Sequence, residues 1–253
     1  MAQTILGVAL LQGTPPPVLF LDIDGTISDI APTPSAAFVP KEAVAALGQL
    51  HERLQGGLII LTGRTSADAD RMLAPLRLPL AAVHGAEMRA PGSGGLVARA
   101  AAVQDALRAT IMRISAPLKG VLVEDKTIAI TVHYRLAPQH REVLLGRLRD
   151  ALAEYPMLGL TAGRMSFEIH NAVRTKAEAV RAMMSGAPFV GRRPIIVGDD
   201  AADADAFVVA EEFGGTGLSV AGEFFAAGDA VFESPAHVRQ WLIEEAGPCS
   251  ITR

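Results

Sequence analysis

Two carboxylates directly follow a run of apolar residues early in the chain. Residues 18–21 read Val-Leu-Phe-Leu, and residues 22–26 read Asp-Ile-Asp-Gly-Thr. Four apolar residues in a row are typical of a short strand that is buried on both faces of a parallel sheet. Ligands of open α/β sheets bind beyond the carboxyl ends of the strands. The pattern therefore predicts Asp22 and Asp24 at the mouth of a site, although Asp-Gly is also common in ordinary turns.

Three further apolar segments stop at polar residues. They cover residues 58–61, 80–83 and 194–197, and they are followed by Thr62, His84 and the pair Asp199-Asp200. If these strands lie side by side, at least three carboxylates meet in one crevice. Two like charges 4 Å apart repel each other by roughly 4 kcal/mol at an effective dielectric constant near 20. Such a cluster needs a proton or a cation, and a set of oxygen ligands suits Mg²⁺.

A lysine completes the set of groups that phosphoryl transfer requires. Lys176 stands at the start of a predicted helix, where it supplies a compact positive charge. A carboxylate nucleophile, Mg²⁺, a lysine, a hydroxyl and a glycine backbone together describe phosphoryl transfer through an aspartyl-phosphate.

The elements around these residues predict an α/β fold. Strand, helix, strand, helix and strand follow one another up to about residue 89, which is the signature of a doubly wound, mostly parallel sheet. The same pattern resumes after residue 171. Residues 90–171 instead read as helix, hairpin, helix, hairpin, after a Pro/Gly-rich cluster at 91–95. We therefore predict a core formed by residues 1–89 and 172–253, with an inserted smaller α+β cap domain at 90–171.

Alternation along the strands of this inserted domain predicts a polar face. Ile128, Ile130 and Val132 point one way, and they are expected to pack on the two helices. The opposite face collects polar residues, with Glu124 and Lys126 at a hairpin corner: His133, Arg135, Arg164, Glu168 and His170. A solvated sheet face would show the same alternation.

Composition restricts the classes of partner. The chain has 253 residues, half of them apolar, and a net charge of −4, so it lacks the basic footprint of a nucleic-acid-binding protein. Its single cysteine, Cys249, fits a reducing compartment. The apolar run at residues 5–11 is too short to span a bilayer. We expect a cytoplasmic monomer that acts on a small molecule and binds neither nucleic acid nor membrane.

The polar residues also match known motifs in order. Residues 22–26, Thr62, Lys176 and residues 198–203 resemble the four motifs of the haloacid-dehalogenase-like phosphatases. The inserted domain corresponds to the α/β cap of that superfamily. More closely, the phrases at 61–64, 84–85, 124–126, 133–135, 167–169 and 198–207 resemble the trehalose-6-phosphate phosphatase family.

The resemblance implies a role for each matching residue. Asp22 would be the nucleophile and Asp24 the general acid and base. A Mg²⁺ ion would be bound by the carboxylates of Asp22 and Asp199 and by the backbone carbonyl of Asp24. The phosphoryl group would be held by Thr62, Gly63, Lys176 and Gly25, with Asp200 and Asp203 in support. The residues expected to bind the rest of the substrate are Arg64, His84, Gly85, Glu124, Lys126, His133, Arg135, Arg164, Glu168 and Asn171.

Three positions depart from the family pattern. Lys176-Ala177 stands where the family usually has Lys-Gly, residues 202–205 read Ala-Asp-Ala-Asp in place of Thr-Asp-Glu-Asp, and His170-Asn171 replaces Arg-Pro. None of these changes removes a catalytic group. The resemblance implies hydrolysis of trehalose 6-phosphate. The alternatives are a phosphatase for another sugar phosphate (sucrose, mannosyl or glucosyl type), a mutase-like phosphotransferase and a non-catalytic sugar-phosphate sensor.

Overall fold

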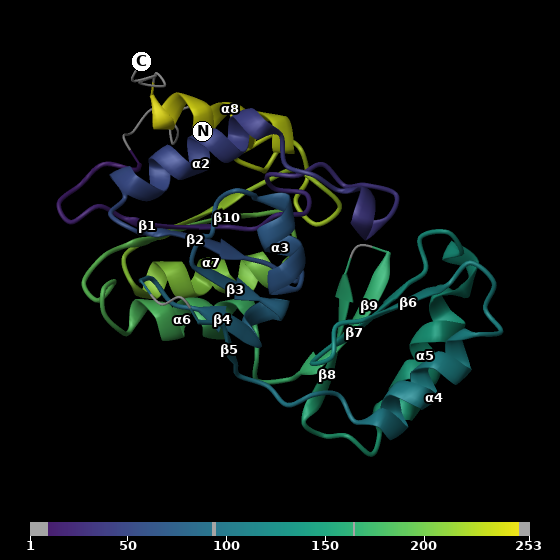
Figure 1. The fold of residues 1–253 in the computed structure, drawn as a ribbon. Coiled ribbons are helices and arrows are strands. Elements are labelled where there is room, and N and C mark those ends of the chain that lie inside the picture. The colour runs from purple at the N-terminus through teal and green to yellow at the C-terminus, as the bar shows by residue number, and fades with distance from the viewer. Residues whose placement is uncertain (1–9, 93–94, 164, 248–253) are drawn as a thin grey trace. The chain divides into compact units, whose positions relative to one another are not determined.

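The chain divides into two compact units in a computed structural model that describes residues 10–92, 95–163 and 165–247 (Figure 1). The core unit comprises residues 1–97 and 176–253, and the inserted unit comprises residues 98–175. That the inserted unit acts as a cap, with limits at 90 and 171, stays a prediction. Arg164, Cys249 and parts of the segments 5–11 and 91–95 lie outside the described residues.

The core unit is built on a seven-stranded sheet with the order β11-β10-β1-β2-β3-β4-β5. The strands from β11 to β3 are parallel, and β4 pairs antiparallel with β3. The strand bounds are β1 Val18–Leu21, β2 Leu58–Leu61, β3 Leu80–Ala82, β4 Glu87–Arg89, β5 Val97–Ala98, β10 Pro194–Gly198 and β11 Thr216–Ser219. The predicted α/β class is confirmed, and the four strands that end in polar residues are neighbours in the sheet.

Helices cover both faces of this sheet (Figure 1). One face packs against α2 (Lys41–Arg53), α3 (Ser66–Met72) and α8 (Pro235–Ala246), and the other packs against α6 (Lys176–Met184) and α7 (Ala201–Glu212). Along β1, Leu19 and Leu21 enter the first core while Val18 and Phe20 enter the second. Because side chains on both faces of β1 are buried, all four of its residues are apolar.

The inserted unit is a four-stranded antiparallel sheet with two helices. The sheet order is β6-β7-β9-β8, with β6 Leu122–Asp125, β7 Ile130–His133, β8 Leu158–Gly163 and β9 Ser166–Asn171. The helices are α4 (Asp105–Ser115) and α5 (Arg141–Leu152). Ile130 and Val132 share one core with residues of both helices, as predicted, whereas Ile128 is buried but is not a member of this core. Short 3₁₀ turns lie at η1 (Pro34–Ala36), η2 (Val83–Gly85) and η3 (Pro138–His140).

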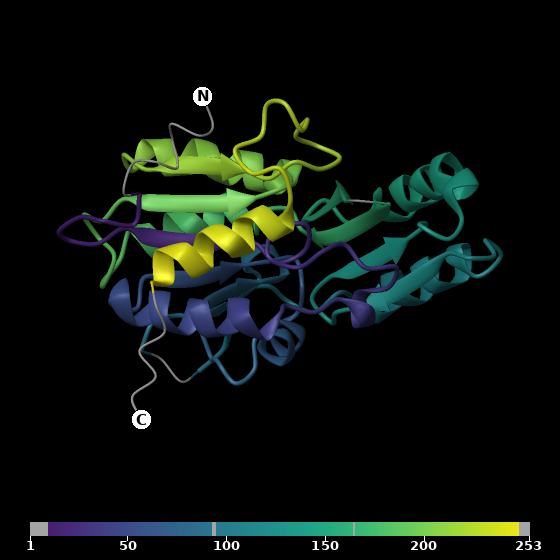
Figure 2. The same cartoon turned by 90° about the horizontal axis from the view of Figure 1, so that it is seen from above.

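The parallel strands of the core unit end at one edge of the sheet (Figure 2). The loops that follow β1, β2, β3, β10 and β11 therefore begin side by side. These loops carry Asp22, Asp24, Thr62, His84 and Asp199.

Candidate active site

Three buried carboxylates gather at this edge. Asp22 follows β1, Asp199 follows β10, and Asp203 lies in the first turn of α7. The register pairs Leu21 with Val197, and the Asp22 amide donates a hydrogen bond to the Val197 carbonyl over 3.1 Å. The strand pairing therefore sets Asp22 beside Asp199. One oxygen from each of the three carboxylates lies within 4.8 Å of the other two.

A glycine makes room for one of these carboxylates. Gly25 adopts a φ of +80°, which is a left-handed conformation that other residues rarely adopt. A Cβ atom at this position would lie 2.1 Å from Oδ2 of Asp199. Position 25 therefore requires a glycine for two reasons: its backbone conformation is left-handed, and a side chain would collide with the neighbouring carboxylate.

Lys176 is the cation of this cluster. It is the first residue of α6, only 1% exposed, and its Nζ donates to Oδ1 of Asp22 over 3.0 Å and to Oδ1 of Asp203 over 2.8 Å. Burial lowers the pKa of Lys176, but the charges of Asp200, Asp203 and Asp22 outweigh it and raise that pKa well above the ordinary value. The lysine therefore stays charged.

Asp203 holds this arrangement together through both of its oxygens. While Oδ1 accepts from Lys176, Oδ2 accepts from the amides of Asp199 and Asp200 over 3.1 and 3.3 Å. Asp200 in turn accepts from the Asp203 amide over 2.9 Å, which closes a capping box at the start of α7. Both oxygens of Asp203 are therefore engaged by groups of the protein itself.

The electrostatics of the cluster favour a further positive charge. Burial raises the pKa of Asp22 to about 6, with Lys176 opposing the shift and with Asp200 and Asp24 adding to it. Burial also raises the pKa of Asp200, but the charge of Lys176 and the hydrogen bonds from Asp203 outweigh it and bring that pKa to about 2. Three carboxylates, those of Asp22, Asp200 and Asp203, thus share one lysine, and Asp199 lies beside them. This donor set fits a divalent cation held by oxygen ligands.

A strained turn presents the polar groups that follow β2 and β3. Thr62 is fully buried, its Oγ1 accepts from the Arg64 amide over 3.1 Å, and its carbonyl accepts from the His84 amide over 3.0 Å. Val83 and His84 adopt φ values of 46° and 53°, a region that a β-branched residue such as valine rarely enters. A Cβ on Gly63 would lie 2.7 Å from Nε2 of His84, so the imidazole packs directly on the Gly63 backbone.

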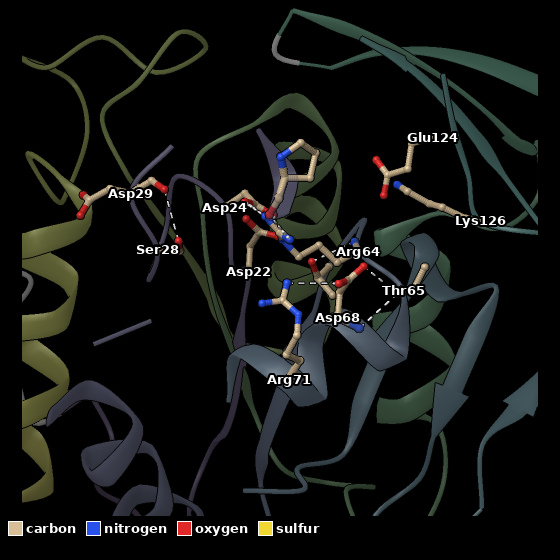
Figure 3. A network of polar contacts seen from close by, with 12 residues as sticks. Asp22, Asp24, Ser28, Asp29, Arg64, Thr65, Asp68, Arg71, Glu124 and Lys126 are labelled. Atoms are coloured by element: carbon tan, nitrogen blue, oxygen red, sulfur yellow. Dashed lines mark hydrogen bonds and ion pairs between the residues drawn. The ribbon is translucent and has the colours of Figure 1, made fainter. Parts of the chain in front are cut away.

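Arg64 contacts Asp24 (Figure 3). Nε and Nη2 of this buried arginine donate to the two carboxylate oxygens of Asp24 over 2.6 and 2.7 Å. Nη1 donates to the Pro34 carbonyl over 3.0 Å. Arg64 therefore fixes the carboxylate of Asp24 against the η1 loop, a contact that no motif in the sequence indicated. Its expected role in substrate binding stays a prediction.

Ion pairs link the polar residues of the inserted unit. His133 Nε2 lies 2.9 Å from Glu124 Oε2, and Lys126 Nζ lies 3.3 Å from Glu168 Oε1. Burial raises the pKa of Glu124, but the hydrogen bond from His133 and the charge of Lys126 outweigh it and lower that pKa. The paired positions of β6, β7 and β9 put these side chains on one face of their sheet.

The remaining predicted residues of this unit fall in different places. His170 is buried and bonds Thr161 over 2.8 Å, a partner that the sequence analysis did not single out. Arg135 is half-buried just after β7. Asn171 falls on the same face of β9 as the apolar residues Phe167 and Ile169, because side chains alternate between the two faces of a strand. Its Oδ1 accepts from the Val173 amide over 3.1 Å. Its part in substrate binding stays a prediction. In the core unit, Gly85 is buried next to His84, and its part in substrate binding also stays a prediction.

Comparison with known proteins shows which family this chain is similar to. The family model described as trehalose-phosphatase matches residues 20–231. A probable trehalose-phosphate phosphatase from Sinorhizobium fredii is 40% identical over 205 residues, covering 80% of this chain and 77% of the relative. The trehalose-6-phosphate phosphatase of Escherichia coli is 34% identical over 202 residues, covering 79% and 76%. The chain belongs to the trehalose-phosphatase family.

Solved structures share the fold of this trehalose-phosphatase family member. The C-terminal domain of Candida albicans trehalose-6-phosphate phosphatase superposes with a TM-score of 0.77 at 22% identity, covering 90% of this chain and 91% of that chain. A trehalose-6-phosphate phosphatase related protein gives a TM-score of 0.71 at 23% identity, covering 90% and 96%. Family membership makes the protein a phosphoric monoester hydrolase. Among the described residues, no helix combines the length and the apolar character that crossing a membrane requires.

Proposed function

We propose that this protein is a Mg²⁺-dependent phosphatase that hydrolyses trehalose 6-phosphate to trehalose and phosphate through an aspartyl-phosphate. The names of its relatives support the substrate. The observation that carries the chemistry is the buried pair of Asp22 and Asp199, whose oxygens lie within 4.8 Å of each other beside Lys176.

In the first step, a carboxylate oxygen of Asp22 attacks phosphorus, and the bond between phosphorus and the sugar oxygen breaks. Asp24, which must first release the Arg64 ion pair and take up a proton from solvent, gives that proton to the leaving oxygen, which departs as the sugar hydroxyl. Lys176 holds Asp22 in place and offsets the negative charge of the site. The Thr62 hydroxyl and the backbones of Gly63 and Gly25 orient the phosphoryl oxygens.

In the second step, Asp24 takes a proton from the water that attacks phosphorus, and the bond to Asp22 breaks to release phosphate. A Mg²⁺ ion held by the carboxylates of Asp22 and Asp199 and by the Asp24 carbonyl would neutralise phosphoryl charge. Asp203 keeps Lys176 and the Asp199 backbone in place through its hydrogen bonds, and Asp200 adds an ion pair to Lys176. Phosphate monoesters react so slowly in water that the site must supply on the order of 20 kcal/mol.

The inserted unit supplies the sugar-recognising groups in this proposal. Glu124, His133, Lys126 and Glu168 form a face of mixed donors and acceptors, which suits a ligand rich in hydroxyls. A site that bonds each hydroxyl discriminates strongly against analogues that lack one. Arg135 and Arg164 are proposed to add cationic donors to the same substrate.

One observation favours a second candidate, a phosphatase for another sugar phosphate. His170 stands where the family usually has arginine, and it is buried against Thr161. A panel of disaccharide and monosaccharide phosphates, with free phosphate as the readout, separates the two candidates. A strong preference for a monosaccharide phosphate would replace the trehalose 6-phosphate assignment.

The decisive experiment measures phosphate release from trehalose 6-phosphate with and without Mg²⁺. We expect turnover only with the metal. Asp22→Asn keeps the size of the side chain but removes the nucleophile, so turnover should fall by at least about 10³-fold. Circular dichroism should show an unchanged fold. Appreciable Mg²⁺-dependent turnover by the folded variant would contradict the mechanism.

A further inference from the structure

An exposed aromatic ring stands on the loop that follows β11. Phe224 is 54% exposed, although large apolar side chains are usually buried. Its ring meets the ring of Phe225 edge to face, with centroids 4.9 Å apart. Phe225 stacks on Phe207 of α7 at 5.8 Å. Phe224 is thus an exposed ring that packs on Phe225, and Phe225 in turn packs on Phe207.

This loop lies next to the proposed metal site. Asp199 directly follows β10, and a Cβ atom on Gly222 would lie 3.6 Å from Oδ2 of Asp199. The Gly222 amide donates to the Phe225 carbonyl over 2.9 Å, which closes the turn that carries Phe224. Two residues span at most about 7 Å, so the backbone of Phe224 stays within that distance of Gly222. Figure 2 shows this yellow-green loop beyond the edge at which β1 and β10 end.

Stability of the core unit does not account for an exposed phenylalanine here, because most of its apolar surface remains in water. Ligand sites, in contrast, are commonly lined by aromatic side chains next to a few polar groups. A pyranose ring presents an apolar face of C–H bonds, and that face stacks well on the face of an aromatic ring. The sugar that bears the phosphate must lie within a few ångströms of the phosphoryl group. The distance between this turn and Asp199 is of the same order.

We propose that Phe224 is a specificity-determining residue that stacks on the sugar ring bearing the phosphate. The inference rests on the proposed sugar-phosphate phosphatase activity and adds a contact from the core unit to it. Neither the motifs in the sequence nor the ion pairs of the inserted unit assign a role to this position.

The test compares a sugar phosphate with a phosphate that has no ring. For Phe224→Ala we measure kcat/KM for trehalose 6-phosphate and for acetyl phosphate in the full-length protein with Mg²⁺. The ratio of the two should fall about 5- to 20-fold, mainly through a higher KM for the sugar phosphate. Phe224→Tyr keeps a ring face and should restore the ratio to within about twofold. Val190→Ala, at an exposed position before β10 at the opposite edge of the sheet, should leave the ratio unchanged.

An equal loss for both substrates in Phe224→Ala would indicate a structural role and overturn the proposal, as would an unchanged ratio. Failure of the proposed function is distinguishable, because it appears in the wild type as a lack of turnover of trehalose 6-phosphate. In that case calorimetry measures the dissociation constants of trehalose 6-phosphate and of inorganic phosphate, and the ratio of these constants replaces the ratio of kcat/KM values. Equal dissociation constants for wild type and Phe224→Ala would then overturn the stacking contact.

Discussion

At the scale of single residues, burial of the proposed nucleophile Asp22 makes its protonation state depend on whether a metal is bound. Asp22 is 4% exposed, and burial raises its pKa to about 6. A protonated carboxyl group does not bind Mg²⁺, so the proton and the metal compete for Asp22. Lys176 opposes the proton, and a bound cation would oppose it further. The carboxylate is therefore expected to be fully ionised only when the metal is present or the pH lies well above 6.

The affinity for Mg²⁺ should consequently depend on pH in one direction. Below about pH 6, the dissociation constant should rise about tenfold for each unit that the pH falls, and above pH 7 it should level off. Isothermal titration calorimetry between pH 4.5 and 8 measures this dependence. Asp22→Asn is the control, since it removes the titrating group and should flatten the profile. A flat profile in the wild type would contradict the raised pKa.

A second residue-scale prediction concerns Thr131 on β7. Its hydroxyl is buried and finds no hydrogen-bond partner among the described residues, although Glu124 and Glu168 lie opposite it on the neighbouring strands. Thr131→Val replaces the hydroxyl by a methyl group of similar size. The variant should be more stable by about 1 kcal/mol, because no unpaired polar group is then buried. Thermal unfolding measures the change. A lower melting temperature for Thr131→Val would mean that water or another group forms a hydrogen bond with the hydroxyl. Thr131→Ser, which keeps the hydroxyl, is the matched control.

At the scale of elements, strands and turns decide where the carboxylates lie. The register of β1 and β10 puts Asp22 beside Asp199, and the capping box of α7 fixes Asp203 under Lys176. The turn after β1 completes the arrangement because Gly25 leaves space for Asp199. These constraints come from backbone conformation, so a change of a single methyl group in the turn should disturb them.

Gly25→Ala tests this constraint, with Gly56→Ala as a matched control. The two glycines have φ values of 80° and 79°, but only at Gly25 would a Cβ meet another group within 4 Å. Both substitutions should cost about 1–2 kcal/mol of backbone strain. Gly25→Ala should also displace Asp199 and lower phosphatase activity by about 100-fold, since a misplacement of about 1 Å has that effect. Phosphate release and Mg²⁺ titration measure the outcome, and similar activities for the two variants would contradict it.

At the scale of the whole molecule, the two units have separate hydrophobic cores. The core of the inserted unit contains Ile111, Leu144 and Phe167. Among the residues that the structure describes, neither core of the other unit includes one from 98–175. Stability is therefore expected to be divided between two cooperative units. A ligand that binds the carboxylate cluster should stabilise the core unit directly.

Phe167→Ala tests this division. The ring is 1% exposed and packs against Tyr134 with centroids 5.1 Å apart, so its loss should cost about 3–5 kcal/mol within the inserted unit. Hydrogen exchange followed by mass spectrometry should show loss of protection in peptides from 98–175. Peptides that contain β1 and β10 should keep the protection of the wild type. Uniform loss across both units would indicate a single cooperative structure.

The sequence by itself determined the strands, their polar ends and the two faces of β7, because burial on one or both faces of a strand imposes a periodicity that is visible in the chain. It also brought Asp22, Thr62, Lys176 and Asp199 into one predicted site, since parallel strands end at a common edge. It did not indicate β4 and β5, two short strands at the β3 side of the sheet whose pairing depends on the finished sheet.

Only the tertiary structure decided how the side chains pair. Arg64 bonds Asp24 from 40 positions away, and Asp203 uses both of its oxygens within the protein. The loop after β11 brings Gly222, two residues before Phe224, next to Asp199. Such contacts depend on strand register, on rotamers and on turn geometry. Local periodicity carries no information about these, because they are fixed only when distant segments pack against one another.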